Sequence, residues 1–266
     1  MTDAERRAAL EGIADEVRVC TRCRLHETRT KAVPGEGDPS TEVMFVGEGP
    51  GMNEDREGRP FVGRAGGLLV NLLGHIGWSR EDVYITNIVK CRPPGNRDPE
   101  PDEIAACAPY LERQLQALDP SVVVTLGRYS MGRFMPGARI SQAHGTTRIA
   151  DPATGARDAT VFAMYHPAAA LRTPAIERES YEDVALIPTV LTEARARRAE
   201  RVRAARTQAA AGAGGQPAAA SVPAAVSATT AVGTLAGDPA TNPATDPASG
   251  PTPPDAEPAD DQLSLF

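Results

Sequence analysis

Four cysteines are the residues of this chain whose types and spacing most clearly could do chemistry. Cys20 and Cys23 form a C-x-x-C pair, whereas Cys91 and Cys107 come much later and apart from each other. Four thiolates can hold a [4Fe–4S] cluster or a structural zinc ion, although free cysteines are also common as ordinary core residues. The pairing, and the RPPGN turn after Cys91 that can fold back to a metal, favour a metal site. The spacing alone does not distinguish an iron–sulfur cluster from a zinc ion, because Cys91 and Cys107 do not form the second C-x-x-C that a zinc ribbon would have.

Three apolar runs end in loops that carry further polar residues. The run at 42–46 (EVMFV) leads into GEGPG, the run at 83–89 (VYITNIV) contains Asn87, and the run at 160–164 leads into YHPAAALR. Short apolar runs bounded by turn residues predict buried strands. Ligands of open parallel sheets bind at the carboxyl ends of the strands. We therefore expect a binding site where these three segments end.

The elements that must position these residues alternate along the chain. A third strand is expected at 121–126, a hairpin joins 146–149 to 160–164, and helices are expected at 4–17, 65–76, 101–118, 129–134 and about 176–206. The first helix delivers the C-x-x-C pair at its end. Strands that alternate with helices predict an α/β fold with a parallel sheet covered on both faces.

The carboxyl-terminal part of the chain differs in composition from the rest. Residues 207–261 are dominated by Ala, Pro, Gly, Thr and Ser, so they bury too little apolar surface to offset chain entropy and are expected to form a disordered linker. The formal net charge of −7 includes six acids after Arg206, and without them the body of the chain has 28 basic and 29 acidic residues. Charge therefore neither requires nor excludes a nucleic acid as partner.

The amino-terminal segment MTDAERRAALEGIADEV has no apolar signal region. No run of the chain approaches the roughly 20 apolar residues of a membrane span. We expect a cytoplasmic protein that does not contact a membrane. In a reducing cytoplasm its cysteines are poor disulfide candidates, which leaves metal binding, catalysis or burial to explain them.

The three motifs together resemble the family-4 uracil-DNA glycosylases. They are GEGPGMNEDREGRPFVGRAGGLL (47–69), TNIVKCRPPGNRDP (86–99) and YHPAAALR (165–172), and the resemblance covers roughly residues 5 to 200. It implies a three-layer α/β/α sandwich with a central four-stranded parallel sheet, a [4Fe–4S] cluster on the four cysteines, and hydrolysis of the N-glycosidic bond of deoxyuridine in DNA to give free uracil and an abasic site, the first step of base-excision repair. The domain is expected to span residues 1–206.

The resemblance implies a base-binding pocket made of Phe61, Asn87 and His166. Phe61 would stack on the everted base. Asn87 would pair with N3–H and O4 of uracil, and it would reject cytosine because cytosine presents the opposite donor and acceptor pattern. His166 would donate a hydrogen bond near O2 as negative charge builds on the departing base. Taken singly, Phe61 would more often be an ordinary core residue and His166 a structural one, and Asn87 could cap the following turn.

The carboxylates of the first motif are harder to assign. We expect Glu54 to orient the attacking water and Glu48 to shape the pocket. Related glycosylases carry an Asp where this chain has Gly49, so the water-activating carboxylate cannot be transferred from them. Backbone N–H groups around Gly49 are expected to contact the base. As loop acids, Glu48 and Glu54 could equally have no function beyond solvation.

Two loops are expected to contact DNA. Leu171 resembles an apolar wedge that fills the space of the extruded base, and Arg172 would bind phosphate. Asn96 and Arg97 in GNRDP are further candidates for DNA contacts. The alternative for each is an ordinary solvated loop residue.

The chain ends in QLSLF, an apolar cluster that follows a long polar tail. It resembles the bacterial sliding-clamp-binding peptide, which implies a tether to the replicative clamp, with a monomeric enzyme held near the nucleoid. The contact residues would be Gln262, Leu263, Leu265 and Phe266.

Two other readings remain. One is a covalent uracil-DNA-binding variant, which uses a histidine in an inserted arginine-rich loop. The segment after Cys91 has neither the insertion nor a histidine. The other is a non-catalytic iron–sulfur DNA-binding accessory protein tethered to the clamp.

Overall fold

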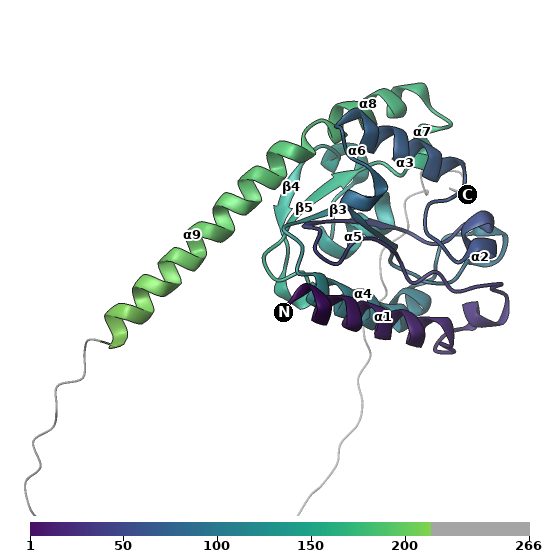
Figure 1. Cartoon of the computed structure of the whole chain (residues 1–266). Coiled ribbons are helices and arrows are strands. Elements are labelled where there is room, and N and C mark those ends of the chain that lie inside the picture. The colour runs from purple at the N-terminus through teal and green to yellow at the C-terminus, as the bar shows by residue number, and fades with distance from the viewer. Residues whose placement is uncertain (214–266) are drawn as a thin grey trace, which may run out of the picture. The chain divides into compact units, whose positions relative to one another are not determined.

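The computed structural model describes residues 1–213, and Met1–Ala205 form its compact unit. The expected linker beyond residue 213 and the carboxyl-terminal peptide lie outside the described residues. Within the described part, the strands form one sheet in the order β2-β1-β3-β5-β4 (Figure 1). The strands are β1 (Val43–Gly47), β2 (Tyr84–Asn87), β3 (Val122–Leu126), β4 (Thr147–Ile149) and β5 (Thr160–Met164). Every pairing is parallel except that of β4 with β5.

The sheet separates two layers of helices, which confirms the expected three-layer α/β/α sandwich. The sheet has five strands and not the expected four, because the antiparallel strand β4 adds to the edge of the parallel strands. Alternate residues of β1 point to opposite faces, as the period of two in a strand requires. Met44 belongs to the core shared with α1 (Asp3–Arg18), α4 (Pro101–Leu118) and α5 (Arg128–Phe134). Phe45 belongs to the other core, which contains residues of α3 (Arg64–His75), α8 (Pro174–Val184) and α9 (Ile187–Ala213). The four parallel strands are buried along their whole length, which explains their continuous apolar sequences.

The remaining elements are short. The sheet and its main helices are joined by α2 (Met52–Glu57), α6 (Ile140–Ala143), α7 (Pro167–Ala170) and the 3₁₀ turns Arg24–Glu27, Arg80–Asp82, Pro94–Asn96 and Pro152–Thr154. No helix in residues 1–213 is long and apolar enough to cross a membrane.

Three element boundaries differ from those expected from the sequence. The second strand ends at Asn87, before Ile88 and Val89. These two residues are apolar because they are buried in the core, and their apolar character extended the predicted strand too far. The glycine-rich loop after β1 contains α2, which its short length and flanking glycines conceal. The closing helical segment divides before Pro188, where a proline suits the first turn of a new helix, and α9 then continues past Arg206 to Ala213.

Candidate active site

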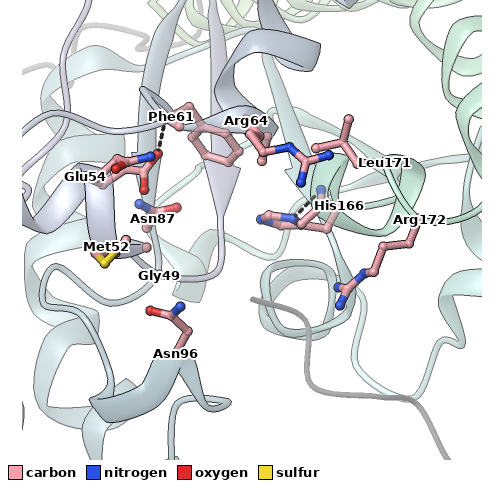
Figure 2. A pocket seen from close by; sticks show the side chains of 15 residues that line it. Gly49, Met52, Glu54, Phe61, Arg64, Asn87, Asn96, His166, Leu171 and Arg172 are labelled. Atoms are coloured by element: carbon pink, nitrogen blue, oxygen red, sulfur yellow. Dashed lines mark hydrogen bonds between the residues drawn. The ribbon is translucent and has the colours of Figure 1, made fainter.

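A cavity of about 320 Å³ opens where the parallel strands end, as the rule for parallel sheets predicts. Figure 2 shows Glu54 and Asn87 on one side of it and His166, Leu171 and Arg172 on the other. Of the residues expected in the site, the structure brings together Gly49, Glu54, Phe61, Asn87, Asn96, His166, Leu171 and Arg172. Glu48 and Arg97 do not line the cavity.

Phe61 and Asn87 approach each other above Gly47, the last residue of β1. A side chain at Gly47 would collide with both, because its Cβ would lie 2.6 Å from Phe61 Cζ and still closer to Asn87 Oδ1. Gly47 also pairs with Asn87 across the sheet. The glycine therefore leaves the space in which an aromatic ring and an amide meet at the floor of the cavity.

The backbone of Phe61 is held in an unusual conformation. Its φ of 51° lies in the left-handed region, which is unfavourable for an aromatic residue. Arg80 stabilises this loop from below: its guanidinium donates to the carbonyl oxygens of Phe61 (2.8 Å) and Pro60 (2.5 Å). The same guanidinium binds Glu36 at 2.7 Å, which fixes its direction. The orientation of the Phe61 ring thus depends on a cation 19 residues away.

Asn87 presents an unused acceptor to the cavity. The residue is 1% exposed, and within the described part of the chain its Oδ1 is buried and accepts no hydrogen bond. A buried amide oxygen without a partner is unfavourable. The amide is therefore poised to pair with a ligand that offers a donor beside an acceptor.

The hydrogen bonding of His166 defines its tautomer. Its Nδ1 accepts from the backbone N–H of Ala168 (3.1 Å), so the neutral ring carries its hydrogen on Nε2. Burial, with a smaller contribution from the nearby charge of Arg172, lowers the pKa of His166 to about 4. The ring lies 5.7 Å from that of Phe61, at 30° to it. His166 is thus a neutral hydrogen-bond donor at physiological pH.

Glu54 lines the cavity and also stabilises the loop that carries Phe61. Its Oε1 accepts from the backbone N–H groups of Val62 (2.9 Å) and Gly63 (2.8 Å). Its Oε2 lies toward Gly51, within 2.8 Å of the position that a Cβ would take there. One carboxylate oxygen is therefore committed to the loop, and the other remains beside the cavity.

Glu48 lies behind the cavity and is fully buried. Its Oε1 accepts from the backbone N–H of Tyr129 (3.0 Å), and its Oε2 has no hydrogen-bond partner among the described residues. Burial raises the pKa of Glu48 to about 7, with a smaller contribution from Asp98. Gly127, with φ 93°, separates Glu48 from His166: a Cβ there would lie 3.0 Å from Cβ of His166. This position agrees with a role in shaping the pocket.

Asn96 and Arg97 point in different directions although they are neighbours. Asn96 lines the cavity, has a φ of 57° and accepts from Nε of Arg92 at 2.5 Å. Arg97 forms two hydrogen bonds with the buried carboxylate of Glu103, at 2.6 and 2.9 Å. Its guanidinium therefore fixes the start of α4 instead of facing the cavity.

Several lining residues were not anticipated from the sequence, and those with long side chains are Met52, Asn53 and Arg64. Arg64 begins α3, and Figure 2 shows it beside Leu171 at the mouth of the cavity. A basic residue directly after the PFVG turn was the available signal for it. The other two are positioned by the unexpected helix α2 and had no comparable signal.

The four cysteines line a second, smaller cavity between α1 and α4. All four are free thiols in the structure. Burial raises the pKa of Cys107 to about 12 and also raises the pKa of Cys23 and Cys91. No group of three or more His, Cys, Asp or Glu side chains within residues 1–213 is arranged to hold a metal ion.

Hydrogen-bond donors surround the sulfur atoms of this cavity. Arg29 donates to Sγ of Cys91 at 3.1 Å, and its charge opposes the effect of burial on the pKa of that thiol. The backbone N–H of Lys90 donates to Sγ of Cys107 at 3.3 Å. Donors aimed at sulfur and a nearby cation are what a set of thiolates requires in a buried site.

Comparisons of the chain with a family model and with curated proteins match it to uracil-DNA glycosylases. The model of the uracil DNA glycosylase superfamily matches residues 34–187. The chain is 49% identical over 192 residues to the Type-4 uracil-DNA glycosylase of Saccharolobus solfataricus, covering 69% of this chain and 87% of that protein. It is 46% identical over 179 residues to the Type-4 uracil-DNA glycosylase of Archaeoglobus fulgidus, covering 65% of this chain and 88% of that protein. Similarity to the Type-5 uracil-DNA glycosylase of Thermus thermophilus is lower, at 38% over 116 residues, or 38% of this chain and 52% of that protein.

Proposed function

Because the chain belongs to the uracil-DNA glycosylase superfamily, we propose that its cavity receives an everted deoxyuridine and hydrolyses the bond between uracil and the sugar. The observation that carries this proposal is the convergence of Phe61, Asn87 and His166 in one cavity. The products are free uracil and an abasic site, so the enzyme starts base-excision repair.

Recognition rests on Phe61 and Asn87. Eversion of the nucleotide costs a few kcal/mol, part of which stacking on Phe61 returns. The Oδ1 of Asn87 accepts from N3–H of uracil while its Nδ2 donates to O4. Cytosine has an acceptor at N3 and a donor at C4, so its binding leaves buried groups mispaired.

Catalysis rests on stabilisation of the leaving base. Cleavage of the glycosidic bond places negative charge on uracil and positive charge on the sugar. The Nε2–H of His166 donates toward O2 of the base, where that negative charge develops. A neutral imidazole makes this bond without transferring a proton.

Glu54 is the proposed water-orienting carboxylate. Its Oε1 is held by two backbone N–H groups, so Oε2 is the atom that positions the water. Glu48 supports the pocket wall from behind, and the backbone N–H groups near Gly49 contact the base.

Leu171 and Arg172 are the proposed contacts to DNA around the flipped nucleotide. Leu171 is 37% exposed at the rim, as a wedge residue must be. Asn96 and Arg64 also line the cavity and are further proposed contacts to DNA. The geometry of Arg97 favours a supporting role for it.

The cysteine cavity is proposed to hold a [4Fe–4S] cluster on Cys20, Cys23, Cys91 and Cys107. The donor set fits, because the four thiols line one cavity, and N–H groups of Arg29 and Lys90 donate to the sulfur atoms of Cys91 and Cys107. When bound, the cluster ties α1 to the β2–α4 segment and so fixes nearby loops. Purified protein should be brown and contain iron; a colourless protein with stoichiometric zinc would exclude the cluster.

We also propose that the terminal peptide of Gln262, Leu263, Leu265 and Phe266, which lies outside the described residues, binds the sliding clamp of the replicative polymerase. The protein then acts as a monomer held near the nucleoid by a long tether. Deletion of residues 262–266 should abolish clamp binding and leave activity on a naked oligonucleotide unchanged. Loss of that activity would contradict the tether.

The test of the proposed activity uses a uracil-containing oligonucleotide followed by alkali. Strand cleavage after alkali indicates an abasic site and therefore a glycosylase. A stable protein–DNA adduct would indicate the covalent variant, and unchanged DNA would indicate an accessory protein. Asn87→Ala and His166→Ala should each reduce cleavage at least ten-fold, in line with the loss of one transition-state hydrogen bond.

A further inference from the structure

Lys90 buries a charged group between the two sites. The residue is 1% exposed and follows the end of β2 directly before Cys91. Its Nζ donates to Oγ1 of Thr86 (2.5 Å), the backbone oxygen of Asn87 (2.8 Å) and Oε1 of Gln114 (2.6 Å). An ammonium group has three N–H donors, so each has an acceptor. In the described structure all three of these acceptors are neutral.

A buried lysine is unfavourable for stability, which suggests that its ammonium group has a function. Burial of an ammonium group costs stability, even with the sulfur of Cys107 nearby, and an apolar side chain of similar length would fill the same space without that cost. The chain also uses arginine for nearly all its basic positions, since Lys31 and Lys90 are the only lysines among 28 basic residues. A compact ammonium can bind three acceptors gathered around one atom, which a planar guanidinium cannot do.

The second of these contacts, with the backbone oxygen of Asn87, reaches the residue that is proposed to recognise the base. Asn87 is the last residue of β2, which pairs with β1 on one side and is bridged on the other side only between Ile85 and Glu36. Lys90 donates to the main-chain oxygen of Asn87 at the end of this strand. Its own backbone N–H is fixed in turn by Sγ of Cys107. One residue therefore connects the cysteine cavity to the strand end that carries the amide.

We propose that Lys90 is a positioning residue for base recognition: its ammonium group fixes the main chain of Asn87 and thereby the side-chain amide that reads N3–H and O4 of uracil. This inference rests on the proposed glycosylase function. It predicts that loss of the ammonium group acts on catalysis through Asn87 and not through a general loss of structure.

The test is a double-mutant cycle of Lys90→Met and Asn87→Ala, measured as single-turnover rates with excess enzyme. The substrates are oligonucleotides with deoxyuridine or with N3-methyl-deoxyuridine, whose base cannot donate to Asn87. Lys90→Met should slow excision of uracil about ten-fold or more, and adding it to Asn87→Ala should slow the reaction less than about three-fold further. Lys90→Met should have little effect on excision of the methylated base. The ratio of the two excision rates, which measures the preference for uracil, should therefore fall toward the ratio of the Asn87→Ala variant.

The matched control is Lys31→Met, which removes the other, exposed lysine and should change neither rate nor preference. Iron content and thermal midpoint are measured for every variant. If Lys90→Met does not fold, Lys90→Arg keeps the charge beside the cysteines and Gln114→Met removes one acceptor, and both should lower the preference for uracil. The positioning role would be overturned if the rate losses of Lys90→Met and Asn87→Ala multiplied in the double variant. It would also be overturned if a folded Lys90 or Gln114 variant kept the wild-type preference for uracil over the methylated base. An inactive wild-type protein would instead contradict the proposed glycosylase function.

Discussion

Replacement of Glu48 by glutamine tests whether the wall behind the pocket carries a buried, titrating carboxyl group. Burial raises the pKa of Glu48 from its usual 4.5 to about 7. At a pH below 4.5 the group is protonated in both the folded and the unfolded chain. As the pH rises to 7 and beyond, the folded protein must bury a carboxylate that the unfolded chain keeps in water. A change of this size corresponds to roughly 3 kcal/mol of stability, which is fully present below pH 4.5 and is lost as the pH rises through about 7.

The Glu48→Gln variant has no carboxyl group to ionise at this position, so it does not lose stability in this way. Its stability relative to wild type should therefore increase with pH. Glutamine keeps the acceptor for Tyr129 and nearly the same shape. For a chain of this size about 1 kcal/mol corresponds to 2–4 °C, so the difference in thermal midpoint should widen by roughly 6–12 °C between about pH 5 and pH 9. Thermal unfolding followed by fluorescence measures it. Glu57→Gln, at an exposed acid of α2, is the control and should give a constant difference. A constant difference for Glu48→Gln as well would refute the reasoning.

Three further predictions follow from the site. Arg80→Gln removes the charged donor to the carbonyl oxygens of Pro60 and Phe61, so the KM for uracil-containing single strands should rise about ten-fold. An unchanged KM would show that the loop keeps its conformation without Arg80. Because the pKa of His166 is lowered to about 4, kcat/KM should stay level as the pH falls to about 5 and decline only below it; a midpoint near the ordinary histidine value would contradict a neutral donor. Cys107→Ser should lose iron and visible colour together with thermal stability, whereas full retention of iron would exclude this residue as a ligand.

Local sequence determined most of the fold. Apolar runs bounded by glycine and proline located the parallel strands, and α4 was predicted over its full length because proline and acids mark its start. The same local signals placed Asn87 near the end of one strand and His166 after another, where parallel sheets bind ligands. These features depend on residues close together in the chain, which is why they could be predicted without the structure.

The tertiary structure decided what each site residue can do. The state of Glu48 depends on burial and on Tyr129, 81 residues away, and the conformation of Phe61 depends on Arg80. The sequence placed Arg97 beside Asn96 as an equal candidate, yet only the fold shows that its guanidinium is bound to Glu103. Protonation, tautomer and side-chain direction are set by the groups that surround a residue in space, and folding brings those groups from distant parts of the chain.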